Sequence, residues 1–133
     1  MAAVKFMEFS ISPVFLFARA CWALVLFAVG VLALLPMEHL QLPIFSWWDK
    51  AQHAVAFAVL TSAALILWQG KKRQVVVGML AYGAAIEAAQ WTVGWRFAEW
   101  SDLAADALGV VLAYSAVHAG ALLLRLGRRA FGT

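Results

Sequence analysis

The chain has 133 residues, of which 65% are hydrophobic and 13% are charged, and its formal net charge is +3. Soluble domains are about half apolar and about one-quarter charged, so this composition excludes an ordinary soluble globular protein and indicates a membrane protein. The positive charge does not indicate a nucleic-acid partner, because basic residues that flank apolar spans normally set membrane orientation.

The apolar runs are long and continuous, without the alternation that marks a membrane β-barrel, so they predict helices. We therefore expect an all-α membrane protein with a single domain over residues 1–133. Its predicted architecture is a four-transmembrane-helix bundle, with helices over about 13–35, 49–69, 74–93 and 102–126.

The first predicted helix begins at Pro13, which suits a first helical turn because its missing N–H has no helical partner there. Arg19 lies early enough in this helix to reach the near membrane surface. A cleaved signal peptide is the alternative, but the apolar run is long and no small-residue cleavage site closes it. We therefore expect this helix to be retained.

Polar and small residues predict how the later helices end and pack. Ser46 and Ser101 are expected to cap the second and fourth helices, and Gly94 is expected to end the third in a left-handed conformation. Small residues at helical spacing predict close packing of the third and fourth helices. These residues are Ala81, Ala85 and Ala89 on the third helix, and Ala105, Gly109 and Ala113 on the fourth.

Basic residues divide unevenly between the two ends of the predicted helices. Two of them, Lys50 and Arg96, fall at one end. This positive-inside bias predicts that both termini are cytoplasmic, and we expect a multi-pass protein of a bacterial inner (cytoplasmic) membrane. The eight basic residues on the predicted cytoplasmic side are Lys5, Arg19, Lys71, Lys72, Arg73, Arg125, Arg128 and Arg129. The tryptophans expected at the outer interface are Trp47, Trp48, Trp91, Trp95 and Trp100.

Each of the last three helices carries polar residues at helical spacing near its outer end. At 1.5 Å per residue the deeper ones lie about 6–9 Å from that end, so they share one layer. An acidic residue that faces lipid costs about 2–3 kcal/mol, and the polar stripes are therefore expected to turn inwards and form a pocket open to the outer surface. The residues are Asp49, Lys50 and His53, then Glu87 and Gln90, then Asp102 and Asp106.

This arrangement suggests both chemistry and binding. We expect His53, Glu87 and Asp106 to be catalytic residues, with His53 and Glu87 suited to exchange protons. Lys50 and Arg96 suit a phosphate group. The full set expected to bind substrate is Asp49, Lys50, Gln90, Arg96 and Asp102.

Two readings of the same polar residues stay open. No certain cofactor is expected, but a divalent metal is left open, because imidazole and carboxylate groups suit zinc or manganese although their spacing matches no compact metal motif. The polar residues could also serve only to hold the bundle together, through pairs of Arg96 with Asp102 or Asp106 and of Glu87 with Gln90.

The polar pattern resembles the VanZ-like family of small bacterial membrane proteins. The resemblance covers about residues 47–113 and rests on Asp49-Lys50-x-x-His53 with Phe57 and Leu60, Glu87-x-x-Gln90, Arg96, and Asp102-x-x-x-Asp106-x-x-Gly109. The family commonly has Asn at the position of Asp106. Its founding member is associated with lowered sensitivity to the glycopeptide antibiotic teicoplanin, so the resemblance implies a role at the cell envelope without specifying a reaction.

We therefore expect a membrane protein that binds or modifies a lipid-linked cell-envelope precursor or a membrane lipid at its outer surface, with an effect on glycopeptide sensitivity. Whether it is an enzyme is left open. The alternatives are a non-enzymatic membrane scaffold whose polar cluster is structural, and a small transporter subunit. A homo-oligomer is also left open.

Overall fold

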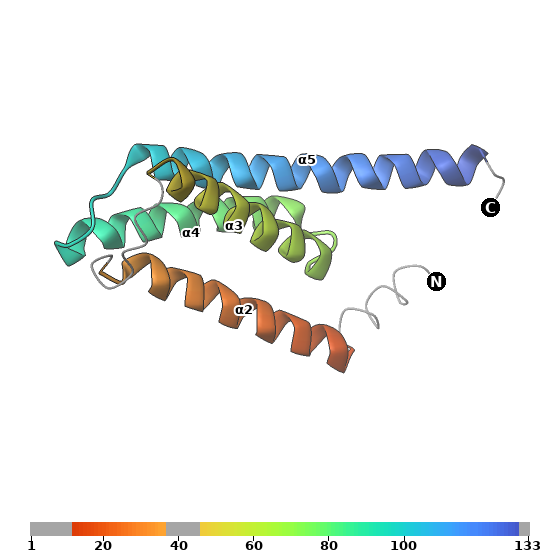
Figure 1. The fold of residues 1–133 in the computed structure, drawn as a ribbon. Coiled ribbons are helices and arrows are strands. Elements are labelled where there is room, and N and C mark those ends of the chain that lie inside the picture. Colours follow the sequence, from red (N-terminus) through yellow and green to blue (C-terminus); the bar gives the residue numbers. More distant parts are fainter. Residues whose placement is uncertain (1–11, 37–45, 131–133) are drawn as a thin grey trace.

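The computed structural model describes residues 12–36 and 46–130, with the side chains of 46–49 excepted. These residues form four α-helices that lie side by side (Figure 1). Neighbouring helices in the chain run in opposite directions, so α2 begins and α5 ends at the same end of the bundle. The helices are α2 (Pro13–Leu34), α3 (Ser46–Leu67), α4 (Lys72–Val93) and α5 (Trp100–Ala130).

The two ends of the bundle are called the acidic end and the basic end. The acidic end holds the end of α2, the start of α3, the end of α4 and the start of α5, together with the loop 94–99. The basic end holds the start of α2 and the turn 68–71 between α3 and α4.

The observed helix ends follow most of the predicted signals. Pro13 is the first residue of α2, and the Ser12 hydroxyl caps the helix by accepting from the Phe15 N–H at 3.4 Å. Gly94 ends α4 with a φ of 78°, which confirms the left-handed end. The expected cap at Ser101 is wrong, because α5 already begins at Trp100. The expected cap at Ser46 involves a side chain outside the described residues.

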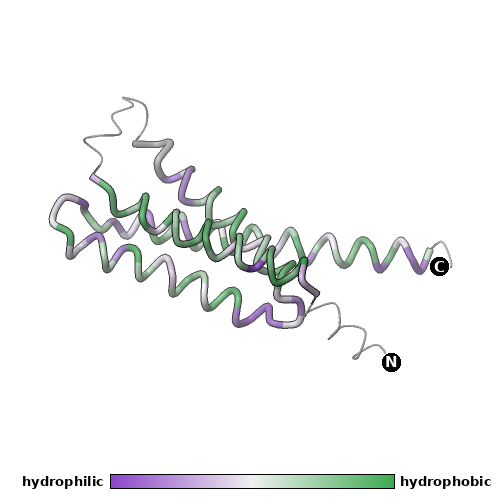
Figure 2. Tube along the Cα trace, turned by 90° about the horizontal axis from the view of Figure 1, so that it is seen from below, coloured by the Kyte–Doolittle hydropathy of each residue, from purple (hydrophilic) through white to green (hydrophobic). Residues whose placement is uncertain are grey.

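Three of the four helices are long and apolar enough to cross a membrane: Pro13–Leu34, Lys50–Leu67 within α3, and Trp100–Ala130. Figure 2 shows hydrophobic residues along the helices and hydrophilic ones towards the ends of the bundle. The remaining helix, α4, has 22 residues like α2 but carries Gln74, Glu87 and Gln90 within its apolar stretch. Its role as a fourth span therefore stays a prediction.

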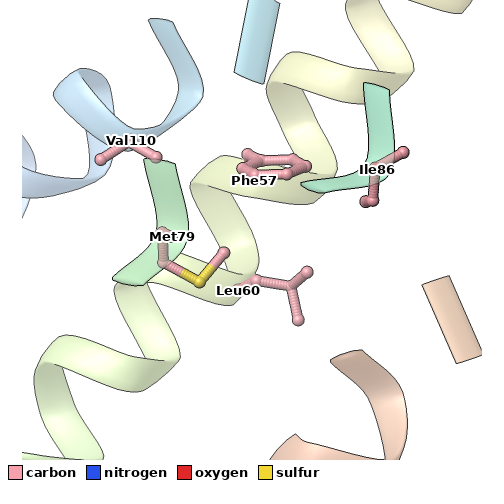
Figure 3. Close-up of a cluster of buried hydrophobic side chains, with 5 residues drawn as sticks. All are labelled: Phe57, Leu60, Met79, Ile86 and Val110. Atoms are coloured by element: carbon pink, nitrogen blue, oxygen red, sulfur yellow. The ribbon is translucent and has the colours of Figure 1, made fainter. Parts of the chain in front are cut away.

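A small apolar core joins α3, α4 and α5. Figure 3 shows Phe57 and Leu60 from α3, Met79 and Ile86 from α4, and Val110 from α5, all at most 5% exposed. No residue of α2 is fully buried. Because lipid tails are as apolar as these side chains, close packing rather than the hydrophobic effect must hold such helices together.

Gly109 explains how α3 and α5 pack so closely. A Cβ at this position would contact the carbonyl oxygen of Ala54 and lie 2.9 Å from the Ala58 nitrogen. Gly109 and Ala113 are buried, which agrees with the expected packing face of α5. The expected stripe on α4 is wrong, because Ala81 and Ala85 are exposed and α4 instead turns its Met79, Gly83 and Ile86 face inwards.

Candidate functional site

The antiparallel arrangement brings polar residues of three helices to the acidic end. The start of α3 contributes Lys50 and His53, the end of α4 contributes Glu87 and Gln90, and the start of α5 contributes Asp102 and Asp106. Asp49 belongs to α3, but its side chain lies outside the described residues.

His53, which is partly exposed, pairs with the buried Asp106 between α3 and α5. His53 Nδ1 lies 3.0 Å from Asp106 Oδ1, and Asp106 is only 1% exposed. The other carboxylate oxygen of Asp106, Oδ2, is buried and has no hydrogen-bond partner among the described residues. Gly83 of α4 leaves the room for this oxygen, since a Cβ there would lie 2.9 Å from it.

Lys50 joins α3 to the loop and to the first turn of α5. Its Nζ donates to Glu99 Oε2 at 2.9 Å, to the Ser101 hydroxyl at 2.8 Å and to Asp102 Oδ1 at 3.1 Å. An ammonium group has three donors, so this cluster engages all of them. The hydrogen bonds from Lys50 and Ser101 lower the pKa of Glu99 from its ordinary value of 4.5.

Glu87 is the buried carboxylate of α4, with 8% of its surface exposed. Its Oε2 accepts from the backbone N–H of Glu99 at 2.9 Å. Its Oε1 is buried and has no partner among the described residues. Three titratable side chains lie close enough to interact electrostatically with the Glu87 carboxylate: Asp102, His53 and Asp106.

Gln90 and Arg96 bind the backbone of α2 instead of the carboxylates. Gln90 Nε2 donates to the Ala33 carbonyl at 3.0 Å, and Arg96 Nε donates to the same oxygen at 3.1 Å. The indole of Trp95 donates to the Leu34 carbonyl at 2.9 Å. These bonds fix the end of α2 against the loop 94–99.

The ion pairs differ from those of the structural alternative that the sequence left open. Asp102 pairs with Lys50 and Asp106 pairs with His53, whereas that alternative paired Arg96 with one of the two aspartates. Glu87 and Gln90 have separate partners, whereas the same alternative paired them with each other. Arg96 reaches Ala33 because Gly94 turns the chain back towards α2.

A pocket of about 560 Å³ lies beside this cluster. Of the predicted site residues that the structure describes, Glu87 and Arg96 line it, while the other five do not. The polar layer therefore has two parts. Glu87 and Arg96 line the pocket, whereas His53 and Asp106 pair with each other away from it. The lining residues are Ala84, Glu87, Ala88, Trp91, Arg96, Phe97, Ala98, Glu99, Trp100 and Leu103.

Three large aromatic side chains of this lining are highly exposed: Trp91 at 81%, Phe97 at 88% and Trp100 at 87%. Exposed aromatic rings of this kind are typical of a membrane interface, where one face is apolar and the edge meets water. Trp91, Trp95 and Trp100 do gather at the acidic end, whereas the side chains of Trp47 and Trp48 lie outside the described residues.

The described residues can be compared with the divalent metal site that the sequence left open. Among the described residues, no group of three or more His, Cys, Asp and Glu side chains is arranged to hold a metal ion. Asp49, a carboxylate of the predicted site, is not covered by this statement because its side chain is not described.

Sequence reasoning missed two features of the site. Glu99 is not among the predicted site residues, yet its N–H binds Glu87 and its carboxylate binds Lys50. A glutamate just before a serine–aspartate helix start offered a weak signal for this role. Thr61 is 0% exposed, and its hydroxyl has no partner among the described residues; an isolated threonine in an apolar run gave no signal.

Comparison with known proteins adds no family. No protein-family model, no curated protein and no solved structure matches this chain.

Proposed function

We propose that this chain is a VanZ-like integral membrane protein whose pocket at the acidic end binds the polar head of a lipid-linked cell-envelope molecule or a membrane lipid. In this proposal all four helices span a bacterial inner membrane, both termini are cytoplasmic and the acidic end faces outwards. The VanZ-like pattern of polar residues and the positive-inside bias support it.

The observation that carries the proposal is that Glu87 lines the pocket and that its Oε1 has no partner among the described residues. A buried acceptor without a donor costs about 1–3 kcal/mol, and a ligand hydroxyl, amide or ammonium group would remove that cost. Glu87 Oε1 is such an acceptor, and Glu87 lines the pocket.

Arg96 adds a site for an anionic part of the same head. A guanidinium has five N–H donors, and the Nε donor of Arg96 is the one that binds Ala33. The two Nη groups are suited to a phosphate oxygen pair. A head with both a phosphate and a hydrogen-bond donor therefore matches the two polar groups of the pocket.

The aromatic residues supply a path for the tail. Trp91, Phe97 and Trp100 are exposed around the pocket, so a hydrocarbon chain can leave it along their rings and enter the lipid. This favours an amphipathic ligand over a wholly soluble one.

Proton exchange at the head would involve Glu87 directly, since Glu87 lines the pocket. His53 and Asp106 do not line it, so in this proposal they hold α3 against α5 and act on Glu87 through their charges. Binding is accordingly the primary function, and modification of the head is an extension of it. An effect on teicoplanin sensitivity follows from the family resemblance.

A non-enzymatic scaffold is the second candidate, favoured by the way polar residues fasten the helices. Gln90 and Arg96 both bind the Ala33 carbonyl, and Lys50 binds three groups around the start of α5. Such contacts stabilise membrane helices without any ligand.

Native mass spectrometry of gently purified protein separates these two functions. In Glu87→Gln, the amide oxygen can still accept from the Glu99 N–H while the charge and the free acceptor are lost. We expect wild type to retain a co-purifying lipid that this variant loses, with an unchanged melting temperature. Arg128→Gln also removes one charge, at an exposed residue of α5 that does not line the pocket, and it should keep the lipid.

Other results would reject the binding proposal. Equal lipid in wild type and Glu87→Gln would show that the pocket does not select its ligand through this carboxylate. Loss of lipid together with a proportional loss of thermal stability would favour the scaffold.

A further inference from the structure

A second pocket, of about 580 Å³, lies towards the basic end of the bundle. It runs between α2 and α4, with the end of α3 behind it, and it shares no lining residue with the pocket at the acidic end. Its α2 wall is formed by Trp22 and Leu26, its α4 wall includes Val75 and Met79, and Lys71 lies at its end in the turn.

Most of the residues that line this groove are apolar, and the polar groups of two of them, Trp22 and Tyr82, bind backbone carbonyls. The Trp22 indole donates to the Leu60 carbonyl at 2.9 Å. The Tyr82 hydroxyl donates to the Leu26 carbonyl at 2.6 Å. Gly78 widens the groove, since a Cβ built there meets nothing within 4 Å. The space therefore suits an acyl chain.

The charge around the groove is entirely positive in the described part of the chain. Trp68 lines the groove, and the guanidinium of Arg19 lies over its ring at 5.3 Å from the centroid. Lys71 follows, with its N–H bound to the Trp68 carbonyl at 3.0 Å, and Lys72 and Arg73 come next. The four acidic side chains that the structure describes, Glu87, Glu99, Asp102 and Asp106, all belong to the acidic end.

We propose that this groove is a binding site for an anionic phospholipid of the surrounding bilayer, with the acyl chain between α2 and α4 and the phosphate at Lys71. Arg19, whose guanidinium binds the Leu67 carbonyl and lies over the Trp68 ring, adds positive charge beside the groove. Basic pockets between membrane helices recognise anionic headgroups in this way. A zwitterionic lipid carries a cation of its own, which the basic residues repel. The proposal does not depend on the ligand of the acidic end, because the two pockets have no residue in common.

The groove can be filled without changing charge. Gly78 has no positive φ, and leucine favours helix more than glycine does, so Gly78→Leu should fold while its side chain occupies the acyl-chain space. Gly120→Leu is the matched control, because Gly120 of α5 also has open space around it. The protein is taken up in vesicles of equal phosphatidylcholine and phosphatidylglycerol, and retained lipids are identified by native mass spectrometry.

We expect wild type and Gly120→Leu to retain phosphatidylglycerol in preference to phosphatidylcholine, and Gly78→Leu to lose the bound lipid. Lys71→Gln should lower the preference about fivefold, the factor that one basic residue contributes at an anionic surface. Lys72→Gln removes the same charge from a residue that does not line the groove, and it should have the smaller effect.

Three results would overturn the proposal. They are equal retention of both lipids by wild type, unchanged retention in Gly78→Leu, and equal effects of Lys71→Gln and Lys72→Gln. Added inorganic phosphate should not displace the lipid; displacement would show a site for a free anion rather than for a lipid. A loss of lipid at the acidic end in Glu87→Gln should leave retention of phosphatidylglycerol unchanged, so the two proposals fail separately.

Discussion

Gly83 sets how closely Asp106 can approach α4. A Cβ at this position would lie 2.9 Å from Asp106 Oδ2 and 3.3 Å from a ring carbon of Phe57. Asp106 cannot easily move away, because its Oδ1 is held by His53 and its side chain is almost completely buried. Glycine at position 83 therefore makes the His53–Asp106 pair possible.

Gly83→Ala should lower the melting temperature of the purified protein. Overpacking of a filled interior costs about 1–3 kcal/mol, which exceeds the gain in helix propensity of about 1 kcal/mol. Gly78→Ala, on the same helix but in open space, should raise the melting temperature. Equal shifts in the two variants would mean that Asp106 has room to move.

The sequence predicts which polar residues meet at the acidic end better than it predicts their partners. Helical spacing alone places His53, Glu87 and Asp106 in one layer, since depth follows from residue number. It does not reveal that Arg96 binds the Ala33 carbonyl. Every residue has a carbonyl oxygen, so the sequence cannot indicate which carbonyl will accept a hydrogen bond. An aspartate, by contrast, can be identified in the sequence as a possible partner of an arginine.

At the scale of elements, α2 differs from the other helices in how it is held. It has no fully buried residue, but side chains from other elements donate hydrogen bonds to carbonyls near its far end and its middle: Tyr82 to Leu26, Gln90 to Ala33 and Trp95 to Leu34. These hydrogen bonds help to hold α2 against the bundle, because its apolar packing is sparse.

Tyr82→Phe should loosen α2 while the ring keeps its contact with Phe57. The lost hydrogen bond to the Leu26 carbonyl is worth about 0.5–1.5 kcal/mol, so amide hydrogen exchange in α2 should become faster. Tyr114→Phe is the control, because Tyr114 lies on α5 and stacks on His118. Equal exchange in α2 for both variants would contradict this account of how α2 is held.

The helices themselves were predicted from continuous apolar runs and end signals, because both properties are local. The inward face of α4 was predicted incorrectly, because Ala81, Ala85 and Ala89 have the helical spacing that is typical of a packing face. The chosen face contains Gly83 and Ile86, which meet α3 and α5 only in the assembled bundle. Which face of a helix turns inwards therefore depends on the neighbouring helices as well as on the sequence of the helix itself.

At the scale of the whole bundle, the described part of the chain is electrically polarised along its length. The acidic side chains that the structure describes belong to one end, and Arg19, Lys71, Lys72 and Arg73 belong to the other. Lys50, at the acidic end, is engaged by Glu99 and Asp102. A positive-inside orientation therefore uses the basic end as the cytoplasmic anchor.

Cysteine labelling tests this orientation and the proposed crossing of α4 together. Cys21 is exposed, so Cys21→Ser is the background. Ala98→Cys then places a thiol in the loop after α4, and Lys72→Cys places one at the first residue of α4. We expect an impermeant maleimide to label the first in intact cells and the second only after permeabilisation, while a permeant maleimide labels both. The reverse pattern would invert the orientation. Labelling of both positions from one side would mean that α4 does not cross the membrane, because its two ends would then share a compartment.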